Sequence, residues 1–95
     1  MSNANDDLEE LRKELDEIDQ KLVKLLAIRF VATKKVGIYK KHNGLPPIDK
    51  SREDAQFKRI EGLAEEAGLD PEFAKRFLRL IIDEVVKKHL AIQKS

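Results

Sequence analysis

The segment LEELRKELDEIDQKLVKL, Leu8–Leu25, decides the fold of this 95-residue chain. Its apolar residues recur at alternating spacings of three and four, which places them on one face of an α-helix. We call this face the apolar stripe: Leu8, Leu11, Leu15, Ile18, Leu22 and Leu25. No proline or glycine interrupts the chain before Gly37, so the pattern predicts one long helix rather than two short ones.

The expected end of this helix is the run HNGLPP, residues 42–47. Gly44 can adopt the left-handed conformation that closes many helices, and the two prolines prevent continuation. We therefore expect a helix from about Asp6 to Lys41, with residues 1–5 frayed. Such a helix extends ~54 Å, whereas a compact chain of this size has a radius of gyration of only about 12 Å. One copy cannot cover the apolar stripe, so we expect an intertwined homodimer.

Two further helices are predicted after the proline pair. Asp49 or Ser51 can cap the second helix, which ends at Gly68. The third helix starts in the segment LDPEF, where Asp70 is the N-cap and a proline follows it, and it continues to about Gln93. No segment alternates with a period of two for long enough to predict a strand.

Composition narrows the range of functions. The 19 Lys and Arg residues nearly balance the 18 Asp and Glu, so the basic excess typical of a nucleic-acid-binding protein is missing. The chain has no cysteine, which removes disulfides and thiolate chemistry. The acidic N-terminus is unlike a signal peptide, and no apolar run approaches the ~18 residues of a membrane span. We expect a cytoplasmic protein with a single all-α domain over residues 1–95, three helices per chain, and neither nucleic acid nor membrane as partner.

Several charged residues fall on positions that the helical pattern turns inward. Continuing the spacing of the stripe leads to Arg29, and Lys40 lies about 20° around the same helix. In the third helix, His89 follows Val85 by four residues and so lies on the apolar face. Each has a purely structural interpretation as an ion-paired or core residue. Helix capping alone could explain the charged loop residues Asp49, Ser51, Arg52 and Glu53.

Together, however, these residues resemble a known family. From about Leu8 to Ile92, without insertion, the chain is similar to the all-helical chorismate mutase family. The resemblance rests on Arg12 and on the segments RFVATKKVGIYK, IDKSRE, GLDPEF and RLIIDE. It implies three helices per chain interlocked in a dimer with two equivalent sites. The implied reaction is the isomerisation of chorismate to prephenate in phenylalanine and tyrosine biosynthesis, which needs no cofactor or metal.

The resemblance implies a role for each candidate residue. Chorismate carries two carboxylates, a ring hydroxyl and an ether oxygen that gains negative charge in the transition state. Arg29 is expected to bind one carboxylate from its own chain, and Arg12 of the partner copy the other. Lys40 is expected to donate to the ether oxygen, and Glu53 to accept from the ring hydroxyl.

Two positions depart from the family pattern. His89 stands where a glutamine often donates to the ether oxygen, and a ring N–H can still do so. Val85 stands where a serine often contacts a carboxylate, and that contact is lost. Asp49 and Arg52 are expected to order the loop and line the same end of the site.

Other functions stay open at this point. An isochorismate pyruvate lyase, or a mutase acting on the amino analogue of chorismate, would resemble this chain in fold and cationic pocket. Glu53 mildly favours a substrate with a hydroxyl group. A non-catalytic helical dimerisation module would need only the apolar stripe, but it leaves Arg29, Lys40 and His89 unexplained. We expect a monofunctional mutase.

Overall fold

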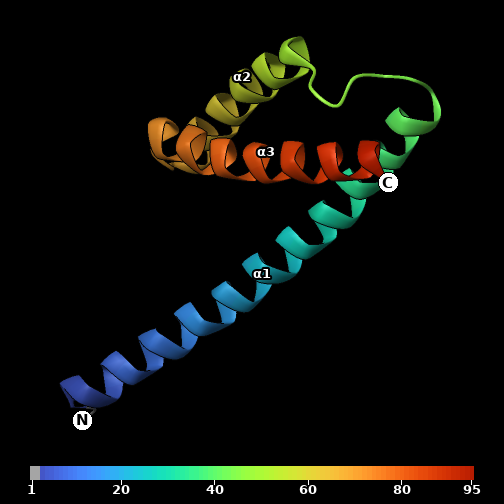
Figure 1. Cartoon of the computed structure of the whole chain (residues 1–95). Helices are drawn as coiled ribbons and strands as arrows, with labels where there is room; N and C mark the ends of the chain where they lie inside the picture. The colour runs from blue at the N-terminus through green and yellow to red at the C-terminus, as the bar shows by residue number, and fades with distance from the viewer. Residues whose placement is uncertain (1–2) are drawn as a thin grey trace. The chain divides into compact units, whose positions relative to one another are not determined.

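The computed structural model describes residues 3–95, which form three α-helices and no strand. The helices are α1 (Ala4–His42), α2 (Lys50–Ala67) and α3 (Pro71–Lys94) (Figure 1). The predicted all-α fold class, with a long N-terminal helix and two shorter ones, is confirmed. The chain divides into two compact units, one that ends at Ala32 and one that comprises Thr33–Ser95, and α1 contributes to both.

The first helix begins two residues before its predicted start. The side chain of Asn3 accepts a hydrogen bond of 2.9 Å from the backbone N–H of Asp6, which caps the first turn. Residues 4 and 5, which were expected to be frayed, are part of this helix in the structure. For residues 1 and 2 that expectation lies outside the described part of the chain.

The unit that ends at Ala32 buries none of its described residues. The six residues of the apolar stripe are between 43% and 64% exposed. The segment is helical as predicted although no neighbouring element covers the stripe, because the backbone hydrogen bonds of a helix form within the helix itself. The predicted apolar surface is thus present and uncovered.

The unit Thr33–Ser95 contains the buried apolar residues. Figure 1 shows α2 and α3 side by side and antiparallel, and α3 supplies most of the buried side chains. They are Ala64, Ala74, Leu78, Ile81 and Ile82. The apolar residues of α3 recur at helical spacing, so one face of it can pack against α2 while the other stays polar.

The turns contain the predicted capping residues. Gly44 and Gly68 have φ values of 65° and 73°, the left-handed conformation that glycine adopts at little cost. Asp70 caps α3 by accepting a hydrogen bond of 3.0 Å from the backbone N–H of Glu72. Pro71 follows at the first helical position. The connection between α2 and α3 is therefore determined by local interactions.

Candidate functional site

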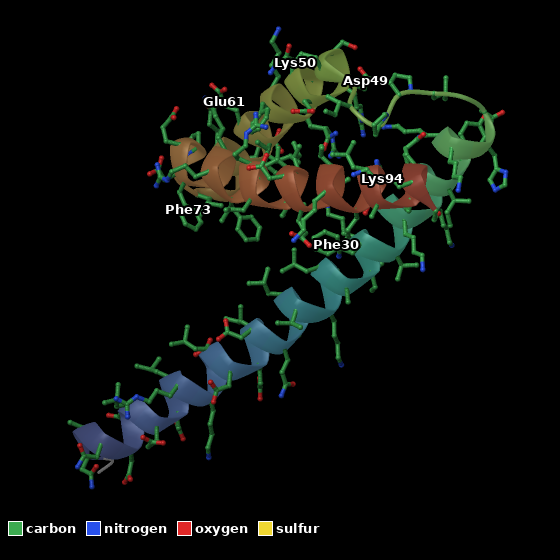
Figure 2. All side chains as sticks on the ribbon, viewed as in Figure 1. Phe30, Asp49, Lys50, Glu61, Phe73 and Lys94 are labelled. Carbon is green, nitrogen blue, oxygen red and sulfur yellow. The ribbon has the colours of Figure 1, made fainter. Side chains whose placement is uncertain are left out.

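The loop between α1 and α2 ends at Asp49, the N-cap of α2, which Figure 2 shows beside Lys50 at the start of that helix. Asp49 Oδ1 accepts from the backbone N–H of Arg52 at 3.1 Å and from the Ser51 hydroxyl at 3.0 Å. These two hydrogen bonds lower the pKa of Asp49 below its ordinary value of 3.8, and the positive charge of Lys40 acts in the same direction. Of the two predicted caps, Asp49 is the one used.

Lys40, in the last turn of α1, contacts the same loop. Its Nζ donates a hydrogen bond of 3.4 Å to the carbonyl oxygen of Pro47. From α3, Gln93 Nε2 donates at 3.2 Å to the carbonyl oxygen of Leu45. Side chains of two helices therefore hold the loop. Lys40 lies close enough to Asp49 for the two charges to interact.

Glu53, in the first turns of α2, faces α3. Its side chain is only 12% exposed, and its Oε1 accepts from Nη1 of Arg79 at 3.3 Å. The same guanidinium lies 3.6 Å from Oδ1 of Asp83 and 4.6 Å from the centre of the Phe57 ring. The sequence interpretation missed Arg79. The available signal was an arginine one turn before an aspartate on the amphipathic α3.

His89 is buried, with 4% exposure, as its place on the apolar face predicted. Its Nε2 lies 2.8 Å from the carbonyl oxygen of Thr33, and Nε2 carries the hydrogen because a carbonyl only accepts. The ring packs against Gly37, where an added Cβ would lie 2.6 Å from the ring Cδ2. Glycine at this position thus lets the ring reach the backbone of α1. No hydrogen-bond partner for the buried Nδ1 is found among residues 3–95.

Arg12 and Arg29 lie in the unit that ends at Ala32. Arg12 is exposed and pairs with Glu9, one turn away, at 3.0 Å. Arg29 is half-buried. The two arginines are 17 residues apart, about 25 Å along one helix at ~1.5 Å per residue, so a single copy cannot bring both to one small ligand.

The last two candidates are Arg52 and Val85. The Arg52 side chain is exposed in the first turn of α2. Val85 is half-buried on α3, four residues before His89, and offers no polar atom to a ligand. Neither has a described side-chain hydrogen bond, so the loop role expected of Arg52 rests so far on its backbone bond to Asp49.

An open groove of about 660 Å³ is lined by residues of α2 and α3. Its apolar lining consists of three phenylalanines and Leu80, and two of the rings, Phe73 and Phe77, stack with centres 6.4 Å apart. Arg76 and Arg79 both line it as well. The sequence interpretation did not predict this groove, because it depends on how the two helices pack.

Two pairs of charged side chains are brought together within Thr33–Ser95: Lys40 with Asp49 at the loop, and Arg79 with Glu53 between α2 and α3. In general, a cation binds a small anion, and a carboxylate accepts a hydrogen bond from a hydroxyl group. Among residues 3–95, no three histidine, aspartate or glutamate side chains lie where they could hold a metal ion. Within the same range, no helix is long and apolar enough to cross a membrane. The described residues define an all-α protein with charged side chains clustered at the loop before α2 and between α2 and α3.

Comparison with known proteins gives the family. The chain matches the family model of chorismate mutase type II over residues 11–90, and it belongs to that family. It is similar to the chorismate mutase of Methanocaldococcus jannaschii, with 36% identity over 76 residues, 80% of this chain and 77% of that protein. It is also similar to the T-protein of Haemophilus influenzae, with 37% identity over 79 residues, 81% of this chain but only 20% of that protein. The resemblance inferred from the sequence is confirmed.

Proposed function

We propose that this chain catalyses the rearrangement of chorismate to prephenate, in the biosynthesis of phenylalanine and tyrosine. One observation carries the proposal: the family match over residues 11–90 includes every candidate residue, from Arg12 to His89. The reaction breaks a C–O bond while a C–C bond forms in the same molecule. The enzyme therefore has to hold the substrate folded and stabilise the charge that develops on the ether oxygen.

Two arginines are proposed to bind the two carboxylates of the substrate. Arg29 binds one from its own chain, and Arg12 of a second copy binds the other. The distance of about 25 Å between them along α1 supports this division, because it exceeds the reach of any side chain. A planar guanidinium suits the task because it can donate two parallel hydrogen bonds to one carboxylate.

The second copy is proposed to be an identical chain that covers the apolar stripe. Six large apolar residues on one face of a helix, each at least 43% exposed, form a contiguous patch of the kind that marks a protein interface. A homodimer would bury that patch and complete two equivalent sites. It would also give Arg12 a role in the site of the other copy. Among residues 3–95 of its own chain, Arg12 makes only the exposed ion pair with Glu9, and such a pair stabilises little.

Lys40 and Glu53 are proposed to act on the polar groups around the reacting bonds. Lys40 donates to the ether oxygen, where its charge favours the transition state more than the ground state. Its contact with Pro47 supports this role, because it keeps Nζ over the loop that carries Asp49. Glu53 accepts from the ring hydroxyl. Arg52 completes the same wall of the site.

His89 is proposed as a second donor to the ether oxygen. In the structure its Nε2–H donates to Thr33 and its Nδ1 is buried. To reach a substrate, the ring has to exchange the Thr33 bond for one to the ether oxygen, or donate from Nδ1 in its protonated form. Val85, one turn earlier, adds only apolar contact.

The experiment that tests the proposal is an assay of the purified protein with chorismate, with the product identified. Conversion to prephenate is the expected result. Isochorismate and the amino analogue of chorismate are assayed in parallel, because salicylate plus pyruvate, or an amino product, would assign a different reaction. If the protein converts none of the three compounds, the proposed function is wrong.

A further inference from the structure

The pair Glu53–Arg79 joins α2 to α3 across 26 positions of the sequence. The carboxylate is the more buried partner, since the Glu53 side chain is 12% exposed and that of Arg79 is 44% exposed. A carboxylate removed from water is costly unless a charge or hydrogen-bond donor compensates it. Arg79 supplies both, and the hydrogen bond to Oε1 restricts the direction in which the carboxylate points.

Arg79 is itself held in place before any ligand arrives. Asp83, one turn later on α3, lies 3.6 Å from its guanidinium, and the Phe57 ring of α2 lies 4.6 Å beneath it. Phe57 follows Glu53 by four residues, so Arg79 spans one face of α2. Contacts from two helices fix the donor, and a fixed donor orients its acceptor more strongly than a mobile one does.

A carboxylate has more acceptor positions than one arginine contact uses. Its two oxygens offer about four lone pairs, and the Arg79 bond occupies one of them at Oε1. Oε2 therefore keeps the capacity to accept from a hydroxyl group while Arg79 holds Oε1. This is the arrangement of a binding residue backed by a positioning residue.

We propose that Arg79 is a positioning residue that holds the Glu53 carboxylate in the direction needed to accept from the ring hydroxyl of the substrate. This inference rests on the proposed function. Arg79 acts through Glu53 and does not itself touch the substrate. Its loss weakens hydroxyl binding in the ground state and the transition state alike, so it raises KM more than it lowers kcat.

Arg76 provides a matched control on the same helix. It lines the same groove, and its guanidinium lies 5.9 Å from the centre of the Phe73 ring. No ion pair with a carboxylate is described for it within residues 3–95. Arg76→Gln therefore removes a cation and an aromatic contact from α3 without changing the partner of Glu53.

The experiment measures kcat and KM for chorismate in Arg79→Gln, Arg79→Lys and Arg76→Gln, with thermal unfolding of each. We expect Arg79→Gln to lower kcat/KM by about 10- to 100-fold, mostly through KM, because it removes a hydrogen bond to a charged group. Arg79→Lys keeps a cation and recovers part of the loss, and Arg76→Gln stays close to the parent. Equal effects of Arg79→Gln and Arg76→Gln would overturn the inference.

A second arm separates positioning from general damage. In a Glu53→Gln background, Arg79→Gln is expected to lower kcat/KM far less than in the parent, because the two residues act as one unit. The same loss in both backgrounds would mean that Arg79 acts independently of Glu53, and the inference would fail. Failure of the proposed function looks different: the parent itself would then convert no chorismate.

Discussion

The two units of the chain follow the same rule of apolar spacing and differ in burial. The apolar stripe before Ala32 is at least 43% exposed, whereas Leu78, Ile81 and Ile82 of α3 are at most 9% exposed. The second group is buried because α2 packs against α3 within the same unit. The spacing of apolar residues thus specifies which face of a helix is apolar, but a neighbouring element determines whether that face is buried.

The largest expected effect comes from a charge on the stripe. Leu22→Asp should prevent assembly and abolish activity, because a carboxylate buried without a partner costs several kcal/mol and each ~1.4 kcal/mol is tenfold in association. We expect the dimer constant to weaken at least roughly 100-fold in sedimentation experiments. Lys21→Asp, one residue away and off the stripe, is the control and should stay dimeric. If Leu22→Asp assembles like the parent, the stripe is not an interface.

Mixing two inactive variants sharpens the same point. Arg12→Ala and Arg29→Ala should each be nearly inactive, yet a mixed dimer would contain one site with both arginines intact. Random exchange makes half of the dimers mixed and half of their sites intact, so roughly a quarter of parental activity should return. A mixture of Arg12→Ala with the double variant can form no intact site. If the first mixture regains no more activity than the second, the two arginines of a site do not come from different copies.

Within the packed unit, two glycines should respond in opposite directions to the same substitution. Gly37→Ala places a Cβ 2.6 Å from the His89 ring and 2.9 Å from Ile92, and such overpacking costs about 1–3 kcal/mol. At Gly62, in α2, a Cβ would meet nothing within 4 Å, so Gly62→Ala should stabilise by up to ~1 kcal/mol through helix propensity. Chemical denaturation measures both changes. Equal stability of the two variants would mean that His89 does not pack on Gly37.

The smallest expected effect is the pH dependence at the start of α2. The pKa of Asp49 is lower in the folded chain than its ordinary value of 3.8, so its ionised form stabilises the fold above that value, and the contribution is lost as pH falls through the folded pKa. Asp49→Asn keeps an oxygen that can cap but does not ionise. Its melting temperature should therefore fall less than that of the parent on acidification. If the melting temperatures of the two proteins fall in parallel with pH, the charge of Asp49 does not contribute to stability.

What could be predicted from the sequence depends on the range of the interactions. The cap at Asp70 and the glycine turns rest on contacts within a few residues, so the sequence pattern located them, and it narrowed the cap of α2 to Asp49 or Ser51. The predicted start of α1 was two residues too late. The side chain of Asn3 caps this helix, and the polar composition of the N-terminal segment alone does not identify Asn3 as the cap.

Contacts between helices could not be predicted in the same way. Which residue pairs with Glu53, and what allows His89 to reach Thr33, depend on the angle and register at which helices pack. Neither Arg79 nor the need for Gly37 follows from periodicity. The inward position of His89 was predictable because it needs only the spacing along one helix.

The connection between α2 and α3 is only three residues long, Gly68–Asp70, and this shortness has a kinetic consequence. Helices joined so closely meet after a small loss of chain entropy, so their pairing should be among the first and fastest events after dilution from denaturant. Its rate should not depend on protein concentration. Any slower step whose rate rises with concentration would then report the encounter of two chains, and the two rates would separate folding from assembly.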